Sequence, residues 1–125
     1  MSEASSAVSY MTRAVGPSML NAYGVLFGGE LLSWMDELSG IAAYRYARCK
    51  VVTAAVERAS FNSPMKLGDF IQLESRVASV GTSSMRILTQ AWVDGQDRQG
   101  SPAAESVFVY VAVDENGKPR KVEAL

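Results

Sequence analysis

Asp36 is the residue of this sequence whose surroundings best suit acid–base or nucleophilic chemistry. Residues 30–48 are rich in Leu, Met, Ala and Glu and predict one long helix of about 27 Å. At about 100° per residue, Asp36 falls beside small residues such as Gly40 and away from the polar sector that holds Glu37. A carboxylate in that place costs desolvation energy unless it is paired or used. The pattern fits both a catalytic carboxylate and one that hydrogen-bonds a partner backbone.

The glycine pair Gly28-Gly29 is expected just before this helix. The first turn of a helix offers free backbone N–H groups and the positive end of the helix dipole. Such donors polarise a carbonyl oxygen and stabilise an oxyanion. A glycine-rich helix cap without a catalytic role would show the same pair of glycines. The pair gains meaning from Asp36, which follows about two turns later and would share one pocket with it.

The absence of histidine narrows the possible chemistry. A His-dependent Ser or Cys triad and His-based metal sites are excluded. The single cysteine, Cys49, rules out Cys-rich zinc sites and an internal disulfide, and we expect it to be an inert residue at the helix end. Any acid–base catalysis therefore depends on Asp, Glu, Lys or Tyr side chains. We expect no metal site and no cofactor, and the lone cysteine favours a reducing, cytoplasmic location.

Length and composition indicate a single globular domain over residues 1–125. The net charge is −1, from 12 basic and 13 acidic residues, and no Lys/Arg run occurs, so nucleic-acid binding is not expected. No apolar stretch reaches membrane-spanning length, and the polar residues 1–6 lack the features of a secretory signal. We expect residues 1–6 to form a disordered tail.

Five strands are predicted around the helix. Alternating or β-branched residues mark them at 7–13, 51–60, 70–80, 84–94 and 103–114. The last is apolar on both faces and is expected in the middle of the sheet. Strand, helix and then four strands is an α+β order, with one helix against one antiparallel sheet. One helix covers only part of such a sheet, so we expect another copy of the chain to cover the rest.

The sequence resembles hotdog-fold acyl-CoA thioesterases over residues 8–122, nearly the whole chain. Residues 21–29, NAYGVLFGG, and 32–37, LSWMDE, are similar to the N-x-x-G-x-x-F-G-G…M-D-E signature of that family. The resemblance continues through VTAAVE at 52–57, FNSP at 61–64, VGTSSM at 80–85 and FVYVAVD at 108–114. The order and spacing of these motifs together make the resemblance specific.

This resemblance implies a hotdog fold, in which one long helix is wrapped by a five-stranded antiparallel sheet. It implies a homo-oligomer whose minimal unit is a dimer, often assembled as a trimer of dimers. Two subunits then form one continuous sheet and share active sites at their interface. The implied substrate is an acyl-CoA thioester, hydrolysed to the free acid and CoA without a separate cofactor.

The resemblance also assigns roles to individual residues. Asp36 matches the family's catalytic carboxylate, and Asn21 and Gly29 match positions that help to form the thioester pocket. Thr53 matches a pocket threonine that orients water. The implied substrate-binding residues, including the turn that contacts CoA, are Phe27, Gly28, Gly81, Thr82, Ser83, Ser84 and Arg86.

Thr82 departs from the family pattern, which places an Arg directly after the glycine of this turn. The phosphate contact implied there is then weaker, or it is supplied by Arg86, Lys66 or Arg58. Each of these basic residues is also typical of a solvent-exposed surface without a binding role.

The sequence leaves the mechanism open between Asp36 as general base towards water and Asp36 as nucleophile that forms a mixed anhydride. It also leaves the acyl chain open, whether aliphatic or aromatic. The main alternative is a hotdog protein that binds acyl-CoA for regulation without hydrolysing it, which the presence of Asp36 disfavours. A hotdog hydratase or dehydratase usually relies on an active-site His, which this chain lacks.

Overall fold

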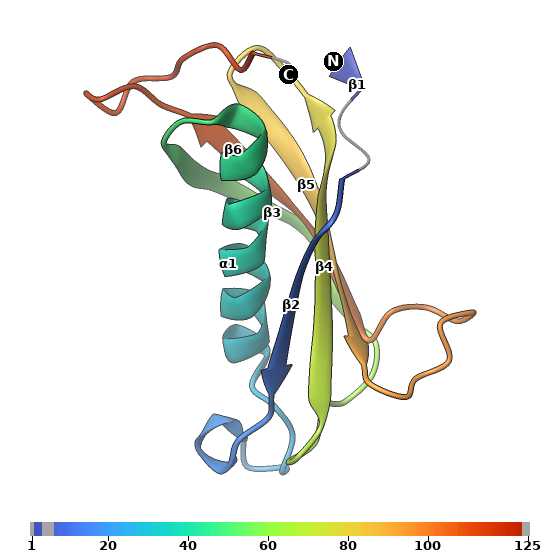
Figure 1. Ribbon diagram of the computed structural model, residues 1–125. Coiled ribbons are helices and arrows are strands. Elements are labelled where there is room, and N and C mark those ends of the chain that lie inside the picture. Colours follow the sequence, from blue (N-terminus) through green and yellow to red (C-terminus); the bar gives the residue numbers. More distant parts are fainter. Residues whose placement is uncertain (1, 4–6, 124–125) are drawn as a thin grey trace.

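One long helix lies against a twisted antiparallel sheet in this computed structural model, which describes residues 2–3 and 7–123 (Figure 1). In chain order the elements are β1 Ser2–Glu3, β2 Ser9–Ala14, the 3-10 turn η1 Pro17–Met19, α1 Gly28–Ala47, β3 Val51–Phe61, β4 Phe70–Val80, β5 Ser84–Val93 and β6 Ala104–Ala112. No helix in the described residues is long and apolar enough to cross a membrane.

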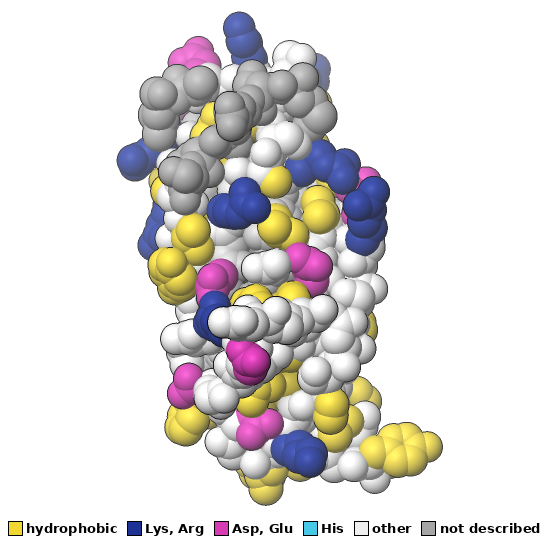
Figure 2. All heavy atoms as spheres, turned by 90° about the vertical axis from the view of Figure 1, so that its right-hand side faces the viewer, with side chains coloured by type: hydrophobic (Ala, Val, Ile, Leu, Met, Phe, Trp, Pro, Cys, Tyr) yellow, Lys and Arg dark blue, Asp and Glu magenta, His cyan; other side chains and the backbone are white. Residues whose placement is uncertain are grey.

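The sheet runs β1-β4-β5-β6-β3, and β2 pairs with β4 on the same side as β1. All the pairings are antiparallel. The strand β6 lies between β5 and β3, which confirms the prediction that residues 103–114 form an interior strand. The strand β3 ends the sheet, and β6 is its one neighbour within the described part of the chain. The face away from α1 mixes charged and polar side chains with small hydrophobic patches (Figure 2).

The predicted elements are present, with ends that differ from the expected ones by no more than two residues. The helix begins at Gly28, so both glycines of the pair belong to its first turn instead of preceding it. Within the segment 1–6, expected to be a disordered tail, Ser2 and Glu3 pair as β1 with the end of β4. Residues 1 and 4–6 lie outside the described residues.

The buried face of α1 packs on the sheet through apolar side chains, namely Leu31, Trp34, Met35, Leu38 and Ala42. At about 100° per residue Ile41 falls in the same sector of the helix, but it is 37% exposed. The reason is that the small residues Ser39 and Ala43, both fully buried, let this flank of the helix approach the sheet and turn Ile41 outward.

A chain of buried hydroxyls ties the helix to the sheet. The Ser39 hydroxyl donates to the Met35 carbonyl oxygen at 2.7 Å and lies 2.6 Å from Thr89 Oγ1 on β5. Thr89 Oγ1 lies 2.5 Å from Ser75 Oγ on β4. Because the Ser39 proton is used on Met35, Thr89 donates to Ser39, and Ser75 donates to Thr89. Each hydroxyl in this dry place has a partner, as buried polar groups require.

Replacing Thr89 with Val is expected to lower the free energy of unfolding by about 1–3 kcal/mol, because Ser39 and Ser75 lose their shared partner in a buried place. Thr89→Ser keeps the hydroxyl and removes one methyl, so it is the matched control and should cost less. Urea titration measures both variants. A Val variant as stable as the wild type would show that the chain of hydroxyls contributes nothing.

Candidate active site

The Asp36 carboxylate lies on α1, half-buried, and is held through one of its two oxygens. Thr53 Oγ1 donates a hydrogen bond to Asp36 Oδ1 at 3.0 Å, and the Tyr110 hydroxyl lies 2.5 Å from the same oxygen. The Tyr110 hydroxyl also lies 2.7 Å from the Asp36 backbone oxygen. Asp36 Oδ2 accepts no hydrogen bond from any residue that the structure describes. One carboxylate oxygen is therefore fixed and the other is available for chemistry.

The register of β3 and β6 explains why Thr53 and Tyr110 reach the same oxygen. The two residues are direct cross-strand partners, so their side chains lie side by side on the face that looks at α1. Tyr110 is only 5% exposed. Burial, and then its hydrogen bond to Asp36, raise the pKa of Tyr110 well above its ordinary value. The hydroxyl is therefore protonated at neutral pH and acts as a donor.

Gly40 makes room for this contact. A Cβ on Gly40 would lie 3.0 Å from the Tyr110 hydroxyl oxygen and 3.4 Å from its ring. Helical spacing puts Asp36 beside Gly40, and the structure shows that the side chain of Tyr110 occupies the space next to this glycine. Tyr110 was missed in the sequence, although a tyrosine in an inward-facing row with Phe108 and Ala112 signals a buried hydroxyl that needs a partner.

Asp36 and Gly29 line one cavity of about 290 Å³ between the first turns of α1 and the strands β3 and β6. The remaining lining residues are Leu32, Ser33, Val56 and Phe108. Of the glycine pair that the sequence places near Asp36, Gly29 lines the same cavity as the carboxylate. A reacting group in this cavity would meet a carboxylate at one end and the start of a helix at the other.

The first turn of α1 carries donors that no side chain caps. Phe27 is the N-cap, and its side chain, which is half exposed, forms no cap hydrogen bond. Leu31 N–H donates to the Phe27 carbonyl oxygen at 3.1 Å, as the first bond of the helix. The N–H groups of Gly28 and Gly29 precede that bond and lie at the positive end of the helix dipole. This geometry suits an oxygen that gains negative charge.

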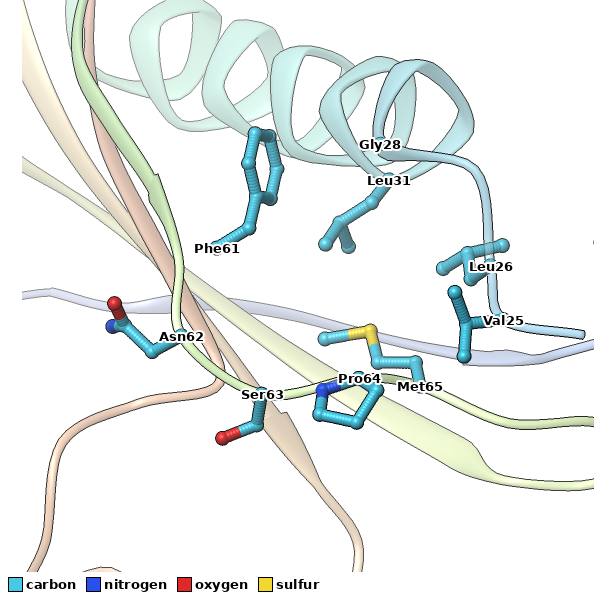
Figure 3. Close-up of a pocket in the computed structure, with 9 residues that line it drawn as sticks. All are labelled: Val25, Leu26, Gly28, Leu31, Phe61, Asn62, Ser63, Pro64 and Met65. Carbon is cyan, nitrogen blue, oxygen red and sulfur yellow. The ribbon is translucent and has the colours of Figure 1, made fainter. Parts of the chain in front are cut away.

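A second cavity of about 300 Å³ lies on the other side of the helix start (Figure 3). It is lined mostly by apolar groups, among them Val25, Leu26, Leu31 and Met65. The ring of Phe61 points up towards the helix beside Gly28 and closes one side of the cavity. Gly28 therefore belongs to this cavity, whereas Gly29 belongs to that of Asp36.

Asn21 shapes the loop that leads into the helix. Its Oδ1 accepts hydrogen bonds from the N–H groups of Tyr23 at 2.9 Å and Val25 at 3.2 Å. These bonds form the tight turn in which Gly24 has a φ of 76°. No hydrogen bond joins Asn21 to Asp36 within the described chain, and the amide nitrogen of Asn21 stays available as a donor.

The predicted CoA turn lies away from the rest of the site. It joins β4 to β5 at the end of the sheet near the C-terminal end of α1, whereas Gly28 and Gly29 lie at the opposite end (Figure 1). Gly81 N–H donates to the Ser84 carbonyl oxygen at 2.8 Å. The carbonyl oxygens of Thr82 and Ser83 accept hydrogen bonds from Val122 and Ala112. One chain alone therefore does not bring this turn to Asp36.

The basic residues considered for phosphate binding have different surroundings. Arg86 forms an ion pair with Glu57 at 2.6 Å, on the face of the sheet away from α1. Lys66 lies in the loop between β3 and β4, where its N–H donates to Asp69 Oδ2. Arg58 adopts a left-handed φ of 51° where β3 shifts register against β6.

The thioesterase superfamily model matches residues 23–99 of this chain. The acyl-CoA thioester hydrolase YciA of Salmonella typhimurium is 40% identical over 108 residues, which cover 83% of this chain and 81% of that protein. An uncharacterized acyl-CoA thioester hydrolase of Zymomonas mobilis is 35% identical over 107 residues, which cover 85% of this chain and 72% of that protein.

The solved structures that this chain resembles include the same kind of enzyme as these relatives. An acyl-CoA hydrolase from Staphylococcus aureus, in complex with butyryl coenzyme A, coenzyme A and coenzyme A disulfide, superposes with a TM-score of 0.83 at 36% identity. The match covers 94% of this chain and 70% of that one. Three single variants of that hydrolase carry Ala in place of an Asn, an Asp or a Thr. The Asp follows the Asn by 15 positions, and the Thr follows the Asp by 17. A hexameric thioesterase from Yersinia pestis gives a TM-score of 0.82 at 36% identity, over 91% of this chain and 93% of that one.

These matches confirm the hotdog fold expected from the sequence, with its helix and antiparallel sheet. They span both the helix that carries Asp36 and the strand that carries Thr53. The chain belongs to the acyl-CoA thioester hydrolases of the thioesterase superfamily.

Proposed function

We propose that this chain hydrolyses acyl-CoA thioesters to a free acid and CoA, with Asp36 as the reacting carboxylate and the first turn of α1 as the oxyanion site. The observation that carries the proposal is the shared cavity of Asp36 and Gly29. A thioester carbonyl in that cavity would point its oxygen at uncapped N–H groups and present its carbon to the carboxylate.

The Staphylococcus aureus hydrolase supports the choice of residues. Asn21, Asp36 and Thr53 follow one another at separations of 15 and 17 positions, the same as those of the three residues replaced in the variants of that enzyme. We infer that these three residues form the catalytic group with Gly29. Thr53 uses its proton on Asp36, so its oxygen remains as an acceptor for the water that it is proposed to orient.

Two routes fit this geometry. In the first, Asp36 takes a proton from water while the water oxygen attacks the thioester carbon, and the C–S bond then breaks to release CoA thiolate. In the second, an Asp36 oxygen attacks the carbon directly, thiolate leaves, and water hydrolyses the mixed anhydride. Thiolate is a good leaving group and takes up the proton afterwards. The reactants are water and a thioester, so the proposed reaction uses no metal ion or redox cofactor.

A second copy of the chain is proposed to complete the site. The strand β3 is an edge of the sheet, and its apolar residues Val52, Val56 and Phe61 are 41, 45 and 52% exposed. Long edge strands with exposed apolar residues favour pairing with another strand. Two copies paired antiparallel along β3 would form one continuous sheet. This pairing would bring the partner's β4–β5 turn to the same end as Gly29.

The substrate's CoA part would then lie along the partner chain. The residues proposed to contact CoA are Gly81, Thr82, Ser83 and Ser84. Lys and Arg side chains lie mainly in the upper half of Figure 2, at the end of the sheet where this turn lies. Cations at that end favour the phosphates of CoA. Three such dimers would give the six subunits of the hexameric relatives. The proposal includes a cytoplasmic location, which the unpaired Cys49 supports.

Replacing Val52 with Lys is expected to separate the dimer and lower turnover at least tenfold, because it places charges on the paired edge and leaves the site incomplete. Thr12→Lys puts the same charge on the exposed part of β2, the opposite edge, and is the matched control. Sedimentation velocity and an activity assay on the same samples check both variants. A Val52→Lys protein that stays dimeric and active would contradict the proposed pairing.

Release of free thiol from a panel of acyl-CoAs, followed with a thiol-reactive dye, tests the activity itself. We expect turnover with at least one aliphatic or aromatic acyl group, and the panel identifies which one the cavity accepts. Binding of acyl-CoA without thiol release from any member would instead identify a regulatory acyl-CoA-binding protein.

A further inference from the structure

The Tyr110 hydroxyl lies within hydrogen-bond distance of two oxygens of Asp36, whereas Thr53 reaches one. The two oxygens that Tyr110 reaches are the carboxylate Oδ1 and the backbone oxygen, at 2.5 and 2.7 Å. A tyrosine hydroxyl carries one hydrogen, so this hydrogen is shared between two acceptors of one residue. The contact thus links the Asp36 side chain to its own helix turn.

We propose that Tyr110 is a positioning residue for the hydrolysis: together with Thr53 it holds Asp36 Oδ1, so that Oδ2 is the oxygen that meets water or the thioester carbon. The inference rests on the proposed function. It adds a residue, and it assigns different tasks to the two oxygens of the carboxylate.

The packing around Tyr110 supports a fixed geometry. The ring belongs to an interior strand, lies next to Thr53 on β3, and sits against Gly40, which leaves it just enough space. A carboxylate on an exposed helix turn samples several rotamers. Two donors converging on Oδ1 select one of them. Because a misplacement of about 1 Å costs up to about 100-fold in rate, the selection of one rotamer affects turnover.

Few charged groups act on the pair formed by Tyr110 and Asp36. Tyr110 is the titratable group that the described residues bring into hydrogen-bond contact with Asp36. Glu37, the next residue along the helix, is turned to the surface and forms an ion pair with Arg13 of β2 at 2.6 Å. Thr53, on β3, is not titratable. Within the described residues, Asp36 Oδ1 is therefore held by neutral hydroxyl groups, those of Thr53 and Tyr110.

Tyr110→Phe tests the inference directly, because it removes one oxygen and keeps the ring. We expect kcat to fall about 10- to 100-fold while KM changes less than threefold. Tyr46→Phe removes the hydroxyl of another tyrosine whose side chain is mostly buried, on α1 and away from Asp36, and should keep wild-type kinetics.

A double-mutant cycle with Gly40→Ala gives a second, independent readout. The added methyl would meet the Tyr110 hydroxyl oxygen at 3.0 Å and displace it, so Gly40→Ala alone should also lower kcat. In the Tyr110→Phe background that oxygen is gone, and the nearest ring atoms are 3.4 Å away. Gly40→Ala should therefore cost clearly less kcat there than in the wild type.

The outcomes separate this inference from the proposed function. Loss of turnover in an Asp36 variant, combined with kcat within twofold of wild type in Tyr110→Phe, would overturn the role of Tyr110 alone. Absence of thiol release from wild-type protein would overturn the proposed function. Equal effects of Gly40→Ala in both backgrounds would show that Gly40 acts through the helix and not through Tyr110.

Discussion

Replacing Asp36 with Asn is expected to lower kcat for acyl-CoA hydrolysis by about 10²–10⁴-fold, because an amide neither takes a proton from water nor attacks a thioester. The substitution keeps the shape of the side chain and one oxygen for the hydrogen bonds from Thr53 and Tyr110. The fold and the oligomer should therefore stay intact. Thiol release at saturating substrate measures the loss, and sedimentation velocity checks the assembly.

Glu37→Gln is the matched control for this result. It makes the same change of charge on the neighbouring residue, whose carboxylate is paired with Arg13 on the surface. An exposed ion pair of this kind contributes little, so turnover should stay within about twofold of wild type. Full activity in Asp36→Asn, or an equal loss in both variants, would remove Asp36 from the reaction.

Replacing Gly29 with Pro is expected to lower kcat by about 10²–10³-fold, the range found when one oxyanion donor is removed. Proline lacks the backbone N–H but is accepted in the first turn of a helix. Gly29 is the second residue of α1 and lines the cavity of Asp36, so the substitution removes a first-turn donor next to the proposed carbonyl oxygen.

Gly29→Ala separates the missing donor from the added bulk. Apart from its chain neighbours and the backbone of its own helix, its Cβ would meet no described atom within 4 Å, and the N–H is kept. We expect its kcat to remain within about threefold of wild type. Circular dichroism should show the same helix content in both variants. If Ala and Pro reduce kcat equally, the helix start binds substrate by shape and not by hydrogen bonding.

The sequence predicted the elements well because the local signals were strong. Alternation in residues 70–80 defined β4 to the residue, and the doubly apolar run at 103–114 identified an interior strand. The helix began two residues earlier than expected, because glycine is a poor helix former that tertiary contacts still accommodate in a first turn. Pairing of Ser2 and Glu3 with β4 depends on the sheet and leaves no trace in so polar a segment.

The candidate site was predictable only in part. Helical spacing placed Asp36 and Gly29 near one another, and the cavity that they share agrees. Tyr110 was out of reach of local patterns, because its contact with Asp36 joins residues 74 positions apart and depends on the register of β3 and β6. The separation of the Gly81 turn from Asp36 is likewise a property of the folded sheet.

Mixing two inactive variants tests most directly the central claim that Asp36 of one chain works with the Gly81 turn of its partner. Gly81→Asp brings a Cβ to 2.7 Å from Ser84 Oγ and puts a negative charge where CoA phosphates are proposed to bind. We expect it to be nearly inactive by itself, as Asp36→Asn is. A mixed dimer of the two variants contains one site in which both partners are unaltered.

Co-refolding equal amounts of the Asp36→Asn and Gly81→Asp chains is therefore predicted to restore thiol release to about a quarter of the wild-type rate, because half of the dimers are mixed and each has one intact site. Activity that stays at the level of the separate variants would mean that each site lies within one chain, and would contradict the account.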